Sequence, residues 1–218
     1  IFGSDHTDAY PDVLLALNAL GENTDNIRVL IYQFVTLLRG GEKIKMSTRK
    51  ANFVTMDDLV DEVGADVVRY FFIMRGMNTH LNFDLDLAAD QSEKNPVYYL
   101  QYAHARICNI IKHGESMGIS TDREFNSTLL NNPTEIKLLK KLEEFQTITE
   151  SMLQSLEPQT IATYLHETAN RFHKFYAECR VITDDSDLTN ARIALARATR
   201  IILSNGLGLL GISSPEKM

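Results

Sequence analysis

The sequence predicts a mostly α-helical protein in which the C-terminal remnant of a doubly wound α/β domain is followed by an all-α helical bundle. Residues 1–55 read as strand, helix, strand and basic loop, which is the order of the closing unit of such a domain. After residue 95, four long segments carry apolar side chains at helical spacing and are joined by short connections. With 44% apolar residues and only 11 Gly and 5 Pro, the 218-residue chain can bury a sizeable core.

The first 38 residues support the α/β assignment. Residues 1–5 read as the end of a buried strand that enters a turn, residues 9–20 as a short helix, and residues 27–38 as a second strand. This second strand lacks the alternation of apolar and polar residues, which is typical of a strand buried on both faces of a parallel sheet. Because a strand at the very start of the chain lacks its partners, we expect the sequence to be the C-terminal part of a longer protein.

Residues 39–55 form a basic loop that leaves the end of this strand. The loop joins two glycines to four cations and two hydroxyl side chains, namely Gly40, Gly41, Lys43, Lys45, Arg49, Lys50, Ser47 and Thr48. Glycines and exposed backbone N–H groups beside lysines can cradle a polyphosphate, although the Walker A pattern is absent. The alternative is a solvated basic loop.

Asp5 lies at a comparable position, because residues 3–6 also leave the end of a strand. Ligands of doubly wound sheets bind where loops leave the carboxyl ends of strands. A carboxylate at this point can accept hydrogen bonds from a ribose. The alternative is that Asp5 only caps a turn.

Downstream of the loop the pattern predicts helices. Thr55 to Asp58 resemble a capping box that opens a helix ending at Val63. A strongly apolar helix is expected at 66–75, followed by two turns and a short helical piece at 85–91. The four bundle helices are expected at 96–117, 134–156, 158–181, and from 187 or 189 to 210.

Two clusters of aromatic and cationic residues lie on the expected bundle helices. The first comprises Tyr98, Tyr99, Tyr102, His104 and Arg106, and the second comprises Arg171, Phe172, His173, Lys174, Phe175, Tyr176 and Arg180. Aromatic and guanidinium planes on helices can stack unpaired RNA bases. The alternative is that most of these rings fill the core of the bundle.

Composition excludes several other classes of protein. The net charge of −7, with 8 Lys/Arg against 14 Asp/Glu in residues 1–90, argues against a nucleic-acid binder that relies on phosphate contacts, but not against one that stacks bases. No apolar run approaches the roughly 18 residues of a membrane span. The two cysteines lie far apart and the histidines lack ligand spacing, so neither a metal site nor a disulfide is predicted, and a reducing cytosolic compartment fits.

The string Lys45-Met46-Ser47-Thr48-Arg49 resembles the K-M-S-K signature of class I aminoacyl-tRNA synthetases. Residues 33–42 and 52–55 around it resemble the arginyl-tRNA synthetase form of that loop. Residues 69–72, 83–87 and 95–106, and the tail that ends in Met218, are also similar to segments of this family. The resemblance covers the whole chain, and the order of its segments is more specific than K-M-S-K alone.

This resemblance implies an arginine–tRNA ligase, which uses ATP with Mg²⁺ to activate arginine and then esterifies it to arginine tRNA. It also implies a cytoplasmic monomer without a membrane segment. The implied parts are the end of a Rossmann-type catalytic domain at 1–55, a helical linker segment at 56–90, and an α-helical anticodon-binding domain at 91–218.

The matched positions supply candidate site residues. The resemblance implies that Lys45 contacts the phosphates with support from Ser47. The implied nucleotide-binding residues are Gly3, Asp5, His6, Lys45, Met46, Ser47 and Arg49. The implied tRNA-binding residues are Tyr102, Arg106, Tyr176 and Met218. Thr48 stands where many class I enzymes have a second lysine, so one phosphate contact is missing or comes from Arg49 or Lys50.

Two parts of the family's catalytic site do not occur in this sequence. They are the His-Ile-Gly-His motif and the arginine pocket, which lie upstream in the family. We therefore expect that this chain alone cannot form the adenylate. The alternative function is a stand-alone helical tRNA-binding module without catalysis. A helical interaction protein would not explain why a basic loop follows a parallel-type strand.

Overall fold

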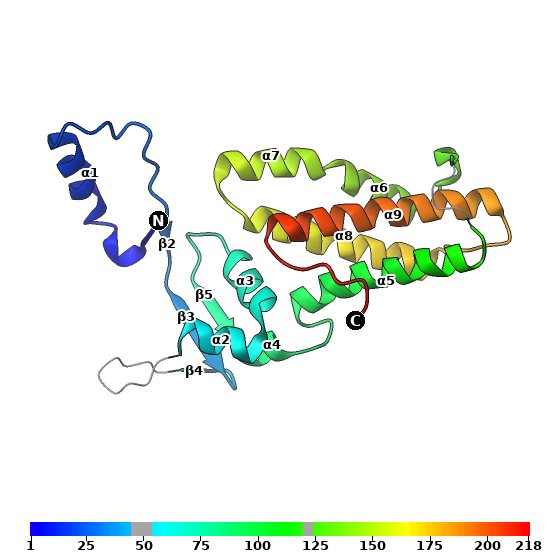
Figure 1. The fold of residues 1–218 in the computed structure, drawn as a ribbon, viewed down its shortest axis with the longest axis horizontal. Coiled ribbons are helices and arrows are strands. Elements are labelled where there is room, and N and C mark those ends of the chain that lie inside the picture. The colour runs from blue at the N-terminus through cyan, green and yellow to red at the C-terminus, as the bar shows by residue number, and fades with distance from the viewer. Residues whose placement is uncertain (45–53, 120–123) are drawn as a thin grey trace.

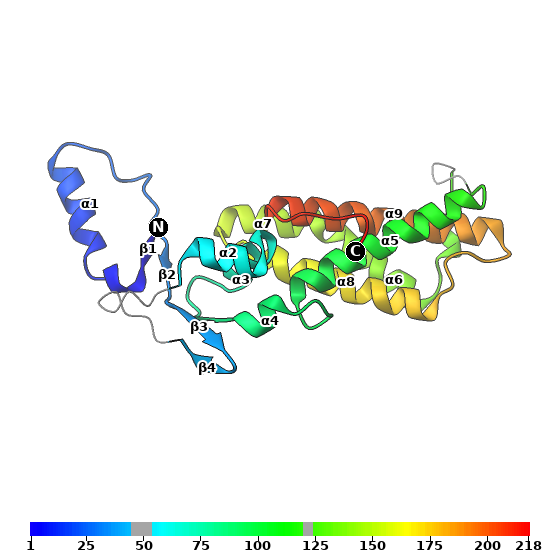
Figure 2. The ribbon, with the colours of Figure 1, turned by 60° about the horizontal axis from the view of Figure 1, so that its bottom comes forward.

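The computed structural model describes residues 1–44, 54–119 and 124–218, which form an elongated molecule (Figure 1). A small N-terminal unit stands apart at one end, a mixed unit of helices and short strands lies in the middle, and a helix bundle forms the other end (Figures 1 and 2). The mostly helical fold expected from the sequence is confirmed. None of the helices in the described part of the chain has the length and hydropathy that a membrane span requires.

The N-terminal unit is a strand–helix–strand crossover. Its elements are β1 (Phe2–Gly3), the 3₁₀ helix η1 (Ser4–His6), α1 (Tyr10–Ala19) and β2 (Ile31–Tyr32). The strands β1 and β2 pair in parallel, with Phe2 opposite Ile31 and Gly3 opposite Tyr32. A parallel pair joined through a helix is the repeating unit of a doubly wound domain. The expected order of strand, helix and strand is therefore confirmed for this unit.

The expected single strand at 27–38 is wrong, because the structure divides this segment between two sheets. β2 ends at Tyr32, and β3 (Val35–Arg39) joins a second sheet with β4 (Glu42–Lys43) and β5 (Leu81–Asp84). β3 pairs in parallel with β5 and antiparallel with β4. β5 was not expected from the sequence. A domain boundary was expected at residue 55. Because β5 follows the helices α2 (Met56–Val63) and α3 (Ala65–Ile73), the sheet contains strands from both sides of that boundary.

The paired glycines at the start of the basic loop form the turn of a β-hairpin. Gly40 and Gly41 have φ angles of 61° and 76° and connect β3 to β4. Two-residue hairpin turns of this kind require positive φ at both positions. The backbone N–H of Gly40 donates to Asp86 Oδ2 at 2.6 Å. These glycines therefore shape a hairpin in which the N–H of Gly40 bonds a carboxylate, and a phosphate cradle at this loop stays a prediction.

The middle unit packs against one end of the bundle. Thr55 and Asp58 form the expected capping box at the start of α2. Phe71 of α3 and Phe83 of β5 are buried, with ring centroids 5.2 Å apart. The hydroxyl of Tyr70 donates to the carbonyl of Ala162 in the bundle, which ties the two units together. The short helix α4 (Leu85–Ala89) leads from β5 towards the bundle.

The bundle reverses direction between α5 and α6, between α7 and α8, and between α8 and α9, whereas α6 and α7 run in the same direction (Figure 1). Its helices are α5 (Pro96–Ser116), α6 (Pro133–Glu143), α7 (Phe145–Ser155), α8 (Gln159–Glu178) and α9 (Ser186–Leu209), with the 3₁₀ helix η3 (Ser127–Leu129) before α6. The helix expected at 134–156 is divided at Glu144, where α6 ends and α7 begins. Helices α5 and α8 run in the same direction and lie side by side (Figures 1 and 2). The N-terminal turns of α5 therefore lie next to the N-terminal turns of α8, and the C-terminal turns of the two helices also lie next to each other.

Candidate nucleic-acid interface

One face of α5 carries a stripe of mixed side chains next to α8. Along this face the residues recur at intervals of three and four, namely Tyr102, Ala105, Arg106, Asn109, Ile110 and His113. Together with Tyr176 of α8 and Met218 at the C-terminus, they line a pocket of about 250 Å³. The structure thus brings together all four residues that the resemblance implied for tRNA binding.

Arg106 contacts both tyrosines of this pocket wall. Its guanidinium lies 4.6 Å from the ring centroid of Tyr102 and 5.4 Å from that of Tyr176. It also donates a hydrogen bond to the hydroxyl of Tyr102. Cation–π contacts of this kind contribute roughly 0.5–1 kcal/mol at exposed sites and more when desolvated. The cation therefore holds the two tyrosine rings in place from inside the pocket.

His173 lies behind the pocket and is held neutral. Burial, and then the nearby Arg106 cation, lower the pKa of His173 to about 4. Its Nδ1 lies 3.4 Å from Arg106 Nη1, which fits a neutral imidazole that accepts a hydrogen bond. Its Nε2 is buried without a hydrogen-bond partner among the described residues. The neutral ring adds no charge that would compete with Arg106.

Stacked rings support the pocket wall. Tyr98 stacks on Tyr102 with centroids 6.2 Å apart, Tyr102 stacks on His173 at 6.2 Å, and Phe172 stacks on Tyr176 at 6.0 Å. Phe172 is fully buried, whereas Tyr176 is 40% exposed. The core interpretation of the aromatic clusters is therefore confirmed for some residues, and the stacking of RNA bases stays a prediction for the others. Phe172 belongs to the core, and Tyr176 presents part of its ring to solvent.

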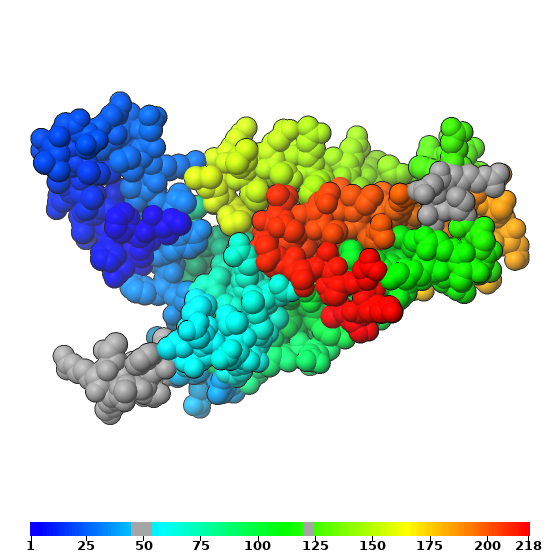
Figure 3. Space-filling model, viewed as in Figure 1, coloured from blue at the N-terminus to red at the C-terminus, as the bar shows by residue number. Residues whose placement is uncertain are grey.

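The C-terminal tail lies along the surface of α5 and ends at the pocket (Figure 3). His104 Nδ1 donates to the carbonyl of Pro215 at 2.9 Å, and Lys112 Nζ pairs with Glu216 at 2.6 Å. Gln101 Nε2 donates to the carbonyl of Ser213 at 3.1 Å. These contacts fix the path of the tail, so that the thioether of Met218, which is 54% exposed, lies beside the tyrosines.

The expected nucleotide-binding residues of the N-terminal unit lie at the end of β1. Gly3 ends the strand, and a Cβ at this position would lie 2.5 Å from Asp5 Oδ1, so a larger residue would require the exposed Asp5 side chain to move. Asp5 and His6 are exposed in η1, with His6 Nε2 3.6 Å from Asp5 Oδ2. The other expected nucleotide-binding residues, Lys45, Met46, Ser47 and Arg49, lie outside the described residues.

Two residues that line the pocket, Asn109 and His113, were not among the candidate site residues predicted from the sequence. Asn109 and His113 continue the helical row of Tyr102 and Arg106, so their spacing was the available signal. Asn109 is exposed and carries both a donor and an acceptor that can reach a base edge. Within residues 1–44, 54–119 and 124–218, no three His, Cys, Asp or Glu side chains gather as metal ligands would.

Comparison with known sequences supports the assignment of the bundle. The family model of the DALR anticodon binding domain matches residues 100–218. The chain is 51% identical over 218 residues to the arginine–tRNA ligase of Salinibacter ruber and 50% identical over 221 residues to that of Chlorobaculum tepidum. Each match covers 100% of this chain but only 39% and 40% of the relative, so the chain spans about two fifths of the length of the curated relatives it matches.

Solved structures give the same result for the fold. A Campylobacter jejuni protein assigned as an arginyl-tRNA synthetase is 31% identical, with a TM-score of 0.86 over 99% of this chain and 46% of that chain. The arginyl-tRNA synthetase of Thermus thermophilus shares the fold, with 20% identity and a TM-score of 0.77 over 100% of this chain and 40% of that chain. The resemblance to arginyl-tRNA synthetases is confirmed by these matches, and through its residues 100–218 the chain belongs to the DALR anticodon-binding domain family.

Proposed function

We propose that this chain is part of an arginine–tRNA ligase and that its bundle binds the anticodon loop of arginine tRNA. The observation that carries the proposal is the pocket in which Tyr102, Arg106, Tyr176 and Met218 meet. These residues come from two helices and the C-terminal tail, and the tail is held against α5 by at least three polar contacts. A surface pocket whose walls are held by such contacts is better suited to binding an unpaired base than to forming part of the core.

The geometry explains how an unpaired base would be held. Tyr176 offers a partly exposed ring, and each base stacked on an aromatic side chain contributes roughly 1–3 kcal/mol. Arg106 already lies against both tyrosines, so little side-chain entropy remains to be lost on binding. Met218 supplies a polarizable thioether that adapts to a ring edge, and Asn109 can read the polar edge of the base.

The charge of the molecule supports binding by stacking. Residues 91–218 carry 14 Lys/Arg against 15 Asp/Glu, so the bundle has almost no net charge. A protein that neutralises few phosphates shows a shallow dependence of affinity on salt. We therefore expect the affinity for the anticodon loop to depend more on the aromatic rings than on ionic strength.

The N-terminal unit is proposed to serve the ATP site of the whole enzyme. Asp5 and His6 leave the carboxyl end of a parallel strand, where doubly wound domains bind nucleotides. We propose that Gly3, Asp5 and His6 approach the nucleoside, and that Lys45, with Ser47, Met46 and Arg49, contacts the triphosphate. Prearranged cations that stabilise charge on a leaving phosphate make a large catalytic contribution. ATP would enter as its Mg²⁺ complex, because Mg²⁺ is commonly bound through substrate phosphates.

The activity itself is expected only of the whole protein, acting as a cytoplasmic monomer on arginine, ATP and arginine tRNA. This chain alone should give no ATP–pyrophosphate exchange, and a signal above background would contradict that expectation. A stand-alone tRNA-binding module is the less favoured reading. The matches to arginine–tRNA ligases also cover residues 1–99, which such a module would not need.

Binding of a fluorescent anticodon stem–loop of arginine tRNA to the 218-residue chain tests the bundle. Tyr176→Ala should weaken binding roughly 5- to 150-fold, which corresponds to the loss of one stacked base. Tyr176→Phe keeps the ring and should bind nearly as well as the parent. Equal affinity of the parent and Tyr176→Ala, or of stem–loops with and without a changed anticodon base, would overturn the assignment.

A further inference from the structure

A second, larger pocket adjoins the first at the far end of α5 and α8. Its volume is about 590 Å³, and it shares Ile110, His113 and Tyr176 with the first pocket. Beyond Tyr176, its wall is formed by Met117 at the end of α5 and by the segment 177–182 that follows α8. An occupant of this pocket would therefore lie directly next to an occupant of the first.

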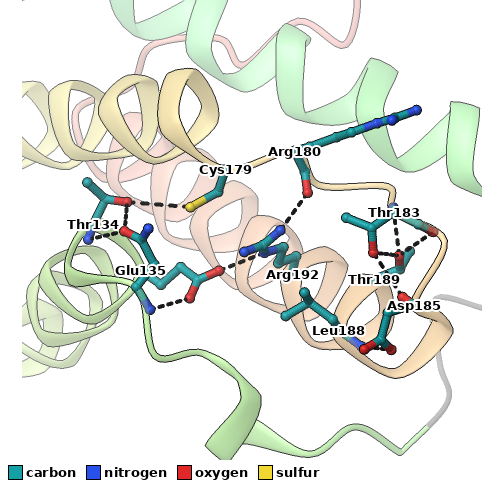
Figure 4. Close-up of polar contacts among 10 residues, drawn as sticks. Thr134, Glu135, Cys179, Arg180, Thr183, Asp185, Leu188, Thr189 and Arg192 are labelled. Atoms are coloured by element: carbon teal, nitrogen blue, oxygen red, sulfur yellow. Dashed lines mark hydrogen bonds and ion pairs between the residues drawn. The ribbon is translucent and has the colours of Figure 1, made fainter.

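The wall of the second pocket is fixed by a buried ion pair (Figure 4). The chain leaves α8 in an extended conformation at Cys179, and the carbonyl of Arg180 accepts a hydrogen bond from Arg192 Nη1 at 2.8 Å. Arg192 Nε in turn donates to Glu135 Oε1 at 2.7 Å, and Glu135 is fully buried. The backbone beside the pocket is thus held by α6 and α9 together.

The side chain of Arg180 extends freely from this wall. Figure 4 shows it extending away from the network that holds its backbone. Arg180 is exposed, and its guanidinium has no hydrogen-bond or ion-pair partner among the residues that the structure describes. A fixed backbone with an unpaired guanidinium at the edge of a pocket is suited to an anionic group of a ligand.

The charges around the pocket give it two different sides. Glu178 also lines it, at the C-terminal end of α8, where the helix dipole adds further negative potential. A phosphate is disfavoured there, whereas an amino group of a base can donate to the carboxylate. Arg180 lies past that end and can take a phosphate. Met117 and Ile182 supply an apolar surface between the two charges.

From these features we infer that the second pocket binds the nucleotide adjacent to the one on Tyr176, with its base on the apolar wall and its phosphate on Arg180. The inference rests on the proposed function, because the occupant of the first pocket is taken to be a base of an RNA loop. A single strand that follows a groove places successive bases at successive sites. Tyr176 would then separate the two bases, since it lines both pockets.

The test uses the 218-residue chain and the labelled anticodon stem–loop over a range of salt concentrations. Arg180→Ala should weaken binding about fivefold at low salt and make the slope of log affinity against log salt shallower by about 0.7, the loss of one single-strand phosphate contact. Arg180→Lys keeps the charge and should keep most of the slope. Met117→Asp, at a position that is 57% exposed, should also weaken binding.

Lys137→Ala is the matched control, because Lys137 is an exposed cation on α6 that lines neither pocket. It should change neither affinity nor slope, and a loss equal to that of Arg180→Ala would overturn the inference. If Tyr176→Ala weakens binding while Arg180→Ala and Met117→Asp bind like the parent, the second site is refuted and the proposed function stands. If Tyr176→Ala also binds like the parent, both fall together.

Discussion

The ion pair between Glu135 and Arg192 should be the most sensitive polar contact of the bundle. Glu135 Oε1 accepts from Arg192 Nε at 2.7 Å, and Oε2 accepts from the backbone N–H of Asn132 at 2.9 Å in a capping box. The Glu135 side chain is completely buried and that of Arg192 is 14% exposed. Among the residues that the structure describes, these partners are the ones that satisfy the two carboxylate oxygens, so removal of either partner leaves a desolvated polar group.

The two halves of the pair are expected to differ in cost. Arg192→Met leaves the Glu135 carboxylate buried and unpaired, which should lower the free energy of unfolding by about 3–5 kcal/mol. Glu135→Gln retains an oxygen for the Asn132 N–H and leaves a cation that is still bonded to the carbonyl of Arg180, so it should cost about 1–3 kcal/mol. The double variant removes both charges, and it should therefore be more stable than Arg192→Met alone.

Urea unfolding followed by far-UV circular dichroism measures all three variants in one double-mutant cycle. Lys137→Met is the control, because Lys137 is exposed on the same helix and should change the free energy of unfolding by no more than about 0.5 kcal/mol. A double variant that lost as much free energy of unfolding as the two single variants lose together would refute the reasoning. A destabilisation by Arg192→Met of less than about 1 kcal/mol would also refute it, because the Glu135 carboxylate would then have found another hydrogen-bond partner or water.

Two further predictions concern stability. Because the pKa of His173 is about 4 in the folded chain against an ordinary value of 6.5, the unfolded chain takes up a proton first, and the free energy of unfolding should fall as pH falls from about 6.5 to about 4. Urea titrations at several pH values should show this fall, and His173→Asn should reduce it. Gly206→Ala should destabilise by about 1–3 kcal/mol, because its Cβ would overlap Leu165 on α8, whereas Gly208→Ala meets no atom within 4 Å and should be neutral or slightly stabilising. Equal unfolding midpoints for the two glycine variants would contradict this explanation.

Helices of the middle unit and of the bundle could be predicted from the sequence because their signals are local. Pro96 at the first turn of α5 and the Thr55–Asp58 capping box mark helix starts within a few residues of chain. The division between α6 and α7 carries no such signal. Glu144 is an ordinary helix former and has αR dihedral angles, and the contacts of α7 with α8 come from residues distant in the chain.

The small sheet could not be predicted, because its pairing is non-local. Val35 pairs with Leu81, and these residues are far apart in the chain. In β5, the buried Leu81 and Phe83 alternate with the exposed Asn82, but four residues are too few to distinguish a strand from a turn. The same pairing explains why the segment 27–38 is not one strand. Its first half completes the sheet of β1, and its second half is drawn to β5.

The pocket shows the same difference between local and non-local information. Tyr102 and Arg106 lie one turn apart on α5, so any helical reading places them on one face. Tyr176 reaches them because α5 and α8 run in the same direction, and Met218 reaches them because the tail after α9 is held along α5 by contacts such as that of His104 with Pro215. Residue spacing reveals neither the direction of the helices nor the path of the tail. The sequence therefore grouped these four residues only through the family resemblance. Arg180 was noticed in the sequence as part of a cationic cluster, yet its proposed role depends on Arg192 and Glu135, which fix its backbone from two other helices. A binding site assembled in this way depends on the packing of the bundle. A substitution of the buried Glu135 should therefore change the position of Arg180 at the surface.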